Sequence, residues 1–173
     1  MTTPVLALLA AGWSIGAPPA GLPVTPAESL SGRKLDFPSA LAGKPTVCVF
    51  SFSREAGEAV GVWMNRLTRD GVDSWSVANL EGAPSLLRGM IRGSMRKGLT
   101  QPLLERSLVL TKNEKAWRAA LGIRQEKLPA VVLLDAAGRL LWRHEGLFGD
   151  EMYRELKSRL EAATARQFEG GAH

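Results

Sequence analysis

The chain has 173 residues, a formal net charge of +5 and a single cysteine. This length fits one domain with extensions, which can bury a core large enough to fold without a metal ion or a disulfide. The single cysteine excludes an intramolecular disulfide. No run of about 20 apolar residues occurs, which argues against a protein with several membrane-spanning helices.

The first 29 residues differ in composition from the rest of the chain. Residues 4–17, PVLALLAAGWSIGA, resemble the apolar core of a secretory signal, although the first basic residue is Arg33. The localisation therefore stays open: export or membrane association is favoured, and an ordered arm or a truncated start is the alternative. Residues 16–30 hold four of the ten prolines and predict an extended linker. We expect residues 1–29 to lie outside the folded domain.

The next segment predicts a strand followed by a helix. Residues 46–52 form an almost continuous apolar run, typical of a strand buried on both faces. From Ala56 to Leu67, apolar residues recur at steps of three and four, which predicts a helix with one apolar face. Asp70-Gly71 ends this helix. Residues 72–77 predict a second strand.

The second half of the sequence predicts one more strand and helix, then a hairpin and a final helix. These elements are a strand at 106–111, a helix at 114–121, a strand at 130–134 and its antiparallel return at 139–145, joined by a turn at 135–138. Asn113 is placed to cap the first of the two helices, and Gly122 to end it. Asp150 is placed to cap the last helix, which carries apolar residues on one face.

Two stretches of the chain resemble the two halves of a thioredoxin-like domain. The first is TVCVFSFSREAGEA, and the second is LGIRQEKLPAVVLLDAAGRLLW. The resemblance covers residues 30–163 and is similar in its lead-in to extracytoplasmic TlpA-type domains. It implies an α/β fold, a three-layer sandwich whose central mixed sheet is flanked by helices, with a helical basic insertion. Residues 164–173 would form a flexible tail.

The resemblance also locates the site where this family carries its two cysteines. Ala56 and Ala59 stand at the two positions of the C-x-x-C motif, with Gly57 and Glu58 between them. A dithiol reaction needs two thiols, the first activated by the helix N-terminus, and alanine offers no nucleophile, proton or redox couple. The usual chemistry of the family is therefore absent from this helix start.

Other catalytic groups are scarce. Cys48 lies between apolar neighbours in the middle of a predicted strand, where a cysteine behaves as a small hydrophobe. His144 is the only histidine apart from the last residue, and we expect it at the surface at a strand end. The sequence therefore predicts no catalytic residue, no metal site and no cofactor.

Leu128 and Pro129 precede the second apolar strand. In the family that the chain resembles, a cis-proline at this position faces the cysteines and exposes backbone groups that pair with an extended segment of the partner. Binding by strand addition needs no cysteine, so Leu128 and Pro129 are candidate partner-binding residues. The alternative is that Pro129 only shapes the loop.

A second candidate surface is the basic segment at residues 85–98, SLLRGMIRGSMRKG. On a helix, its leucines and methionines lie broadly on one side, whereas Arg88, Arg92 and Arg96 step by four along another, followed by Lys97. This pattern is typical of a basic amphipathic helix that binds an anionic membrane or a protein partner. The alternative is an ordinary helix with a solvated basic edge. No aromatic residue is interleaved for base stacking, so nucleic acid is not expected as a partner.

The hairpin sequence VVLLDAAGRLLWRHEG more narrowly resembles the family of mitochondrial-type F-ATP synthase assembly factors. That family carries the pattern L-x-D-x-x-G-x-I-R-W-x-x-x-G, which this chain matches at Asp135, Gly138, Trp142 and Gly146. Leu141 departs from it, because the family tends to have arginine there. This resemblance implies a non-enzymatic chaperone that acts on a membrane subunit.

Two functions of different classes follow from these observations. The first is a non-catalytic binding or assembly protein whose partner is another protein, such as a subunit of a membrane complex. The alternative is a thiol-disulfide oxidoreductase or peroxiredoxin-like redox protein that acts through Cys48 or through the thiols of a partner.

Overall fold

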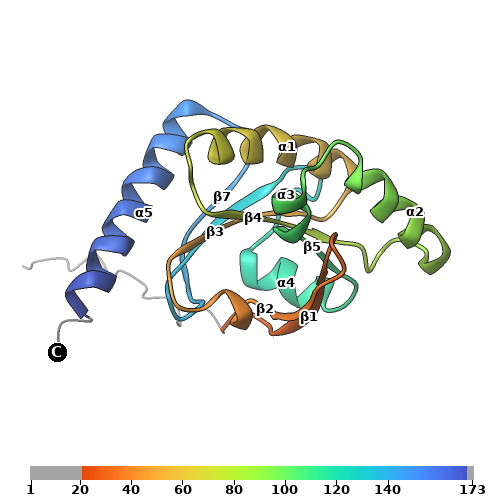
Figure 1. The fold of residues 1–173 in the computed structure, drawn as a ribbon, viewed down its shortest axis with the longest axis horizontal. Helices are drawn as coiled ribbons and strands as arrows, with labels where there is room; N and C mark the ends of the chain where they lie inside the picture. Colours follow the sequence, from red (N-terminus) through yellow and green to blue (C-terminus); the bar gives the residue numbers. More distant parts are fainter. Residues whose placement is uncertain (1–20, 171–173) are drawn as a thin grey trace, which may run out of the picture.

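The computed structural model describes residues 21–170, within which a seven-stranded mixed sheet is flanked by helices (Figure 1). The strands are β1 (Thr25–Ser29), β2 (Lys34–Phe37), β3 (Thr46–Ser51), β4 (Ser74–Asn79), β5 (Ser107–Leu110), β6 (Ala130–Leu134) and β7 (Leu140–Glu145). The helices are α1 (Arg54–Arg69), α2 (Ser85–Arg96), α3 (Gln101–Glu105), α4 (Glu114–Leu121) and α5 (Asp150–Gly170), with a short 3-10 helix η1 at Ser39–Leu41.

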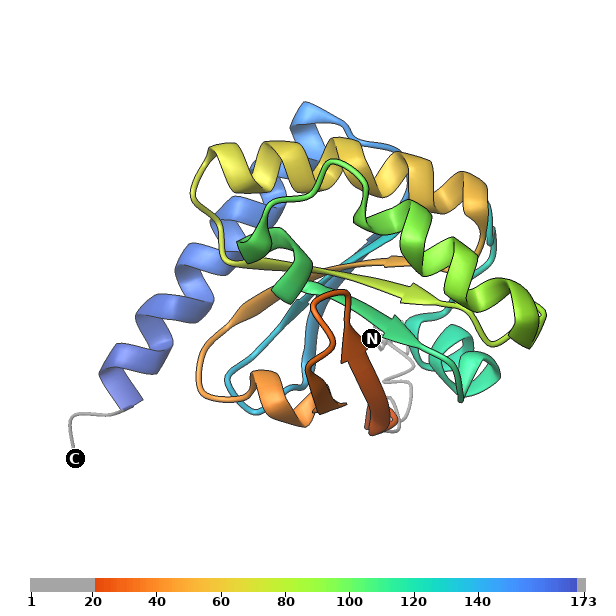
Figure 2. The same ribbon diagram turned by 45° about the vertical axis from the view of Figure 1, so that its right-hand side comes forward.

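The strand order across the sheet is β2-β1-β5-β4-β3-β6-β7. Strands β3, β4 and β5 are parallel to one another, and α1 connects the first pair while α2 and α3 connect the second. The strands at both sides of this parallel centre are antiparallel to their neighbours. Figure 2 shows β4 and β5 side by side with the helices between them in sequence lying over one face. The predicted α/β sandwich with a mixed sheet is confirmed.

The unit of β3 and α1 forms for the reasons that the sequence indicates. Every residue of β3 is buried, because helices cover the centre of the sheet on both faces. Ser53 is the N-cap of α1, and its side-chain oxygen accepts a hydrogen bond from the amide of Ala56 at 3.1 Å. The helix ends before Gly71, whose φ of 69° is in the left-handed region that favours glycine.

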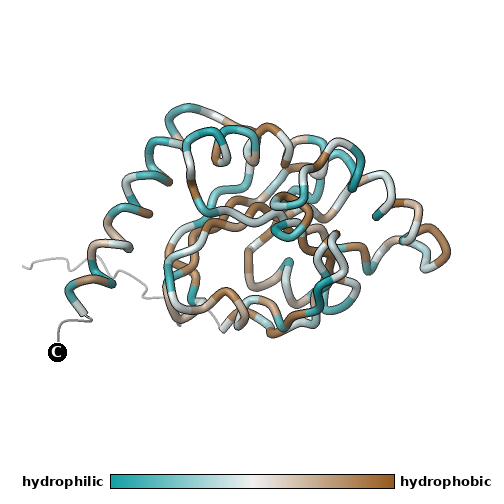
Figure 3. The backbone as a smooth tube through the Cα atoms, in the orientation of Figure 1, coloured by the Kyte–Doolittle hydropathy of each residue, from teal (hydrophilic) through white to brown (hydrophobic). Residues whose placement is uncertain are grey.

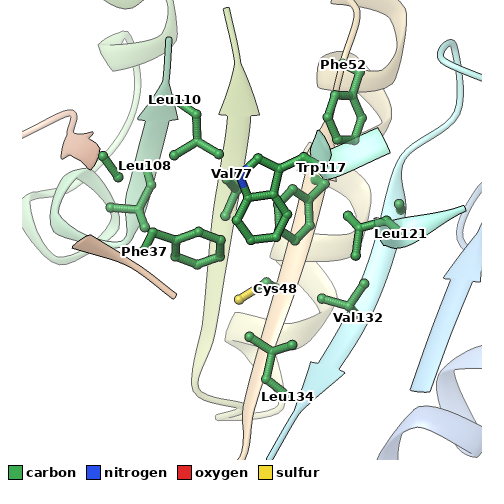
Figure 4. Packing of buried hydrophobic residues seen from close by; sticks show 13 residues of the cluster. Phe37, Cys48, Phe52, Val77, Leu108, Leu110, Trp117, Leu121, Val132 and Leu134 are labelled. Carbon is green, nitrogen blue, oxygen red and sulfur yellow. The ribbon is translucent and has the colours of Figure 1, made fainter. Parts of the chain in front are cut away.

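One half of the core lies between the sheet and α4 (Figure 4). Its centre is aromatic: the ring centroids of Phe37 and Trp117 are 5.2 Å apart, and those of Phe50 and Trp117 are 5.3 Å apart. The other half lies between the sheet and the pair α1 and α5, where Trp63 and Leu156 are fully buried. Trp63 of α1 and Trp117 of α4 are thus the large side chains that set the distance of each helical layer from the sheet.

The N-terminal strand corrects the predicted boundary at residue 29. Strand β1 lies inside the sheet, between β2 and β5, rather than in a linker. Pro26 is compatible with this position because β5 pairs only with Ala27–Ser29, so the missing amide of Pro26 costs no hydrogen bond to that neighbour.

Thr25 joins this strand to α4. Its hydroxyl oxygen accepts hydrogen bonds from the indole N–H of Trp117 at 2.9 Å and from the side-chain amide of Asn113 at 3.0 Å. The predicted capping role of Asn113 is therefore wrong: the residue stands at the N-cap position with a φ of 62°, but its side chain bonds Thr25 and not the helix. The predicted end of the helix at Gly122 is confirmed.

The last helix is longer than the sequence indicates. α5 continues to Gly170, so residues 164–170, predicted to be part of a flexible tail, are helical. Ala163, at the predicted end of the domain, is buried in the core cluster that α1 and α5 form with the sheet. The predicted domain boundary at residue 163 thus falls inside a continuous helix.

The contact between α1 and α5 predicts a dependence of stability on pH. The Tyr153 hydroxyl donates to an Asp70 carboxylate oxygen at 2.7 Å, and Arg66 Nε donates to the same oxygen at 3.1 Å. The hydrogen bond from Tyr153, followed by that from Arg66, lowers the pKa of Asp70. Burial, followed by the hydrogen bond to Asp70, raises the pKa of Tyr153 to about 12.

We expect Tyr153→Phe to lower the melting temperature at neutral pH and to flatten its pH dependence. The lowered pKa of Asp70 stabilises the fold above the unfolded value of about 4, and this stabilisation is lost as the pH falls through the folded value. The raised pKa of Tyr153 stabilises the fold below about 10, and this is lost as the pH rises towards the folded value. Calorimetry across both windows tests this expectation, and parallel curves for wild type and variant would contradict it.

Gly146, between β7 and α5, occupies a position without room for a side chain. A Cβ atom there would lie 2.7 Å from Nε2 and 3.0 Å from Cε1 of His144. We expect Gly146→Ala to destabilise the protein by about 1–3 kcal/mol because the imidazole ring has to move. Thermal unfolding measures this loss, with Gly149→Ala in the same loop as the control, since nothing lies within 4 Å of its added Cβ. Equal melting temperatures for the two variants would refute the argument.

Candidate functional site

The first turn of α1 is the place where a thiol pair would lie. Ala56 is completely buried and Ala59 is half-buried, whereas Gly57 and Glu58 face solvent. The two alanine methyl groups pack inward, and the exposed part of this turn is a glycine and a carboxylate. The surface here can contact a partner, but it carries no nucleophile.

The electrostatics of this helix start involve the neighbouring loop. A hydrogen bond from its own backbone amide is the largest cause that lowers the pKa of Glu55, and the nearby Lys127 and Arg54 contribute to the same direction. Arg54 also forms an exposed ion pair with Glu58, with 3.4 Å between Nε and Oε1. An exposed pair of this kind contributes little to stability. Both charges therefore remain accessible to a partner.

The loop before β6 lies beside the start of α1. Ala130 pairs with Phe50 near the end of β3, which places the Pro129 loop next to the connection from β3 into α1. Pro129 is buried, and its carbonyl accepts a hydrogen bond from the amide of Gly146 at 3.0 Å. The structure therefore brings the Ala56–Ala59 turn and the Leu128–Pro129 loop together, as the resemblance implies.

The cis bond that the resemblance implies at Pro129 is absent. Among residues 21–170, Phe37–Pro38 is the only cis peptide bond. The chain reverses before Pro129 by other means: Gly122 adopts a φ of 60°, and the Leu128 amide donates to the carbonyl of Gln125 at 3.0 Å. A trans bond, which is the default for X-Pro, is then sufficient to enter β6.

Glu145, at the end of β7, holds the tip of this loop, a role that the sequence analysis missed. Its carboxylate accepts hydrogen bonds from the amides of Arg124 at 3.0 Å and Gln125 at 2.6 Å. Successive backbone amides that point at one carboxylate form a small anion-binding concavity, occupied here by the protein's own side chain. Because these residues are about 20 positions apart in sequence, only the β6–β7 hairpin geometry brings them together.

Cys48 is sealed inside the core (Figure 4). It points from β3 into the layer under α4, among residues that include Phe37, Val132 and Leu134. Burial, with a smaller contribution from the charge of Asp73, raises the pKa of the thiol well above its usual range. The thiolate is the reactive form, so this cysteine is shielded and protonated at neutral pH.

The arginines of the basic segment form contacts within the protein. Arg92 lies 3.1 Å from a carboxylate oxygen of Glu28 on β1, with only about a fifth of its side chain exposed. Arg96 Nε donates to the carbonyl of Leu30 at 2.8 Å, just after the same strand. These two side chains fasten α2 to the N-terminal hairpin.

Arg88 fastens the other end of α2. Its Nε donates to the carbonyl of Ala83 at 3.0 Å, and its Nη2 donates to the carbonyl of Glu81 at 2.8 Å. Lys97, after the last turn, is exposed. These contacts run to β1 and to the loop after β4, so the basic segment is a surface separate from the turn and loop around Ala56 and Pro129.

An open groove of about 460 Å³ lies between α2 and the N-terminal hairpin. Its charged lining residues are Glu28, Lys34, Asp36 and Arg92, two of each sign. Such a balance gives the groove no preference for a ligand of one charge.

The described part of the chain offers little for metal binding. Across residues 21–170, no three His, Cys, Asp or Glu side chains gather in a way that could hold a metal ion. His144 is half-buried rather than exposed. Its ring centroid lies 5.9 Å from the ring centroid of Trp63 and 6.2 Å from that of Trp142. Its Nε2 is buried without a hydrogen-bond partner. Within the same range, no helix has the length and apolar character needed to cross a membrane.

Comparison with known proteins identifies the fold. No protein-family model matches the chain, and no curated protein matches its sequence. Among solved structures, BsSco, a member of the Sco family of cytochrome c oxidase assembly proteins, superposes with a TM-score of 0.60 at 11% identity, covering 84% of this chain and 94% of its own.

Two further neighbours are redox proteins by name. A thio-disulfide isomerase from Thermus thermophilus has a TM-score of 0.53 at 17% identity, covering 84% of this chain and 97% of its own. A thiol peroxidase from Chromobacterium violaceum has a TM-score of 0.53 at 13% identity, covering 84% and 88%. Identities this low are informative about the fold alone. The chain therefore has a thioredoxin-like α/β fold.

Proposed function

We propose that this protein is a non-catalytic binding or assembly protein on a thioredoxin-like scaffold. The observation that carries the proposal is the loss of accessible thiol chemistry: alanine occupies both positions of the helix start, and Cys48 is sealed in the core. The neighbours in structure include an assembly protein as well as thiol enzymes, so the fold is compatible with this role. The narrower role is assembly of a membrane complex, of which the ATP synthase suggested by the hairpin sequence is one case.

The binding surface would be the first turn of α1 together with the Pro129 loop. Gly57, Glu58 and Lys127 are exposed there, and the charge of Lys127 contributes to lowering the pKa of Glu55 in the same turn. The Pro129 carbonyl and the Leu128 amide are already hydrogen-bonded within the chain. Strand addition at this loop would have to replace those bonds, so contacts with side chains are the simpler mode of binding.

The alternative is a thiol-dependent redox function, as in two of the structural neighbours. It requires that Cys48 become exposed or that the partner supply both thiols. A buried, protonated thiol in the middle of a strand is a poor nucleophile. The two functions therefore differ in what they require of Cys48.

We expect the Cys48 thiol to be inert in the folded protein. Ellman's reagent should leave it unmodified under native conditions and titrate it after unfolding in guanidinium chloride. Cys48→Ala should cost on the order of 1 kcal/mol of stability through a small cavity and leave partner binding unchanged. Rapid native labelling, or insulin reduction by wild type that the variant loses, would favour the redox function instead.

The partner surface can be mapped by site-specific photo-crosslinking. A benzoylphenylalanine at Glu58 should crosslink a specific protein from a membrane extract, because this exposed side chain lies at the proposed surface. The matched control carries the same probe at Arg166, an exposed position of α5. We expect mass spectrometry to identify a subunit of one membrane complex at Glu58 only. The same products at both positions, or none at Glu58, would refute the proposed surface.

A further inference from the structure

We propose that α2 docks the protein on an anionic lipid bilayer through an apolar ridge formed by Leu86, Leu87 and Met90. The side chain of Leu86 is 93% exposed, that of Met90 is 66% exposed and that of Leu87 is 44% exposed. They occupy the first turn and a half of the helix. In Figure 3 the hydrophobic colouring reaches the outermost turn of α2, which forms the right-hand edge of the molecule in Figures 1 and 2.

The ridge lies on the side of α2 away from the arginine contacts with the rest of the chain. At 3.6 residues per turn, the row of Arg88, Arg92 and Arg96 lies roughly opposite Leu86 and Met90. Each arginine is engaged by Glu28 or by backbone carbonyls of the same chain. Ile91 and Met95 of the same helix are half-buried, so the ridge is the part of its apolar surface that stays exposed.

Nothing else in the described chain covers this side of α2. A Cβ atom added at Gly89 or Gly93, which flank the ridge, would meet no atom within 4 Å. An exposed leucine standing alone needs no explanation, but three large apolar side chains on consecutive turns of one protruding helix form a patch. Because it is a convex ridge and not a groove, its shape suits insertion between lipid head groups better than reception of a partner helix.

Charge complementarity identifies the lipid as anionic. From Gly82 to Leu104 the sequence has four basic residues and no acidic one. Arg96 and Lys97 are exposed at the end of the helix, and Lys97 follows Met90 on the ridge side by about two turns. Exposed positive charge at the end of the helix, with no acidic residue in the segment, favours binding of the ridge to negatively charged membranes.

This inference goes beyond the proposed function and does not depend on it. The ridge lies on α2, whereas the proposed partner surface lies on α1 and the Pro129 loop, and the two share no residue. Failure of lipid binding would leave the partner surface untested, and failure of crosslinking at Glu58 would leave the ridge untested.

The test compares variants of the full-length chain in vesicle co-sedimentation. Vesicles of phosphatidylcholine with phosphatidylglycerol are compared with vesicles of phosphatidylcholine alone. We expect wild type to prefer the anionic vesicles and to dissociate with added salt. Leu86→Ser/Met90→Ser should weaken binding at least about tenfold. The matched control is Leu147→Ser/Phe168→Ser, which removes two apolar side chains that are 63% and 76% exposed elsewhere, and it should bind as wild type does.

A second measurement reports the ridge alone, apart from any other apolar segment of the chain. In a Cys48→Ala background, Leu87→Cys carries an environment-sensitive NBD label, with Leu147→Cys as the control. We expect anionic vesicles to shift the emission of the label at position 87 to the blue, and to leave that at position 147 unchanged.

Three results would overturn the proposal. The first is an unshifted label at position 87, and the second is equal vesicle binding by the serine double variants. The third is that a second copy of this chain covers the ridge. Wild type would then sediment as a dimer without lipid, and Leu86→Ser/Met90→Ser would convert it to a monomer. Circular dichroism on each variant confirms folding, which these exposed substitutions should preserve.

Discussion

The junction at Gly146 is the constraint on which the arrangement of the site depends. Its carbonyl accepts the indole N–H of Trp63 at 3.2 Å, and its amide donates to the carbonyl of Pro129 at 3.0 Å. The ring of His144 fills the space where a side chain would begin. One residue without a Cβ thus fixes helix α1, the loop before β6 and the end of β7 relative to one another.

This junction explains why the site keeps its geometry without its thiols. In a thiol enzyme, the chemistry of two cysteines is a reason to hold the helix start against the facing loop. Here the same two segments are held by three contacts. Trp63 packs against the sheet, the methyl group of Ala56 is buried, and the Glu145 carboxylate accepts hydrogen bonds from the loop. These contacts order both segments before a partner binds, and an ordered surface lowers the entropy cost of binding.

Much of the fold could be predicted from the sequence, because the signals for it are local. The uninterrupted apolar run at 130–134 is strand β6 with the expected ends, and α4 covers the expected residues 114–121. Strand β1 could not be predicted. Its composition is typical of a linker, and it is held by pairing with β2 and β5 and by the contact of Thr25 with Trp117, 92 residues later in the chain.

The candidate site could be placed from sequence but not described in detail. The positions of Ala56 and Pro129 follow from the resemblance to thioredoxin-like domains, whereas the isomer of the Pro129 bond depends on turns that the pattern does not contain. The helical pattern of α2 separates an apolar side from a basic side but does not say which faces inward. The orientation of α2 depends on the contacts of its arginines with Glu28 and with the carbonyl of Leu30, which lie more than 60 positions earlier in the chain.

The inward arginines also make α2 and β1 a mechanically coupled pair. A force that lifts α2 from the sheet acts on the contacts of Arg92 and Arg96, and through them on the strand that carries Thr25. Thr25 in turn holds the indole of Trp117 at the centre of the layer under α4. A load on the outermost helix is thus transmitted across the sheet to the opposite layer of the core, without passing through the surface around Ala56.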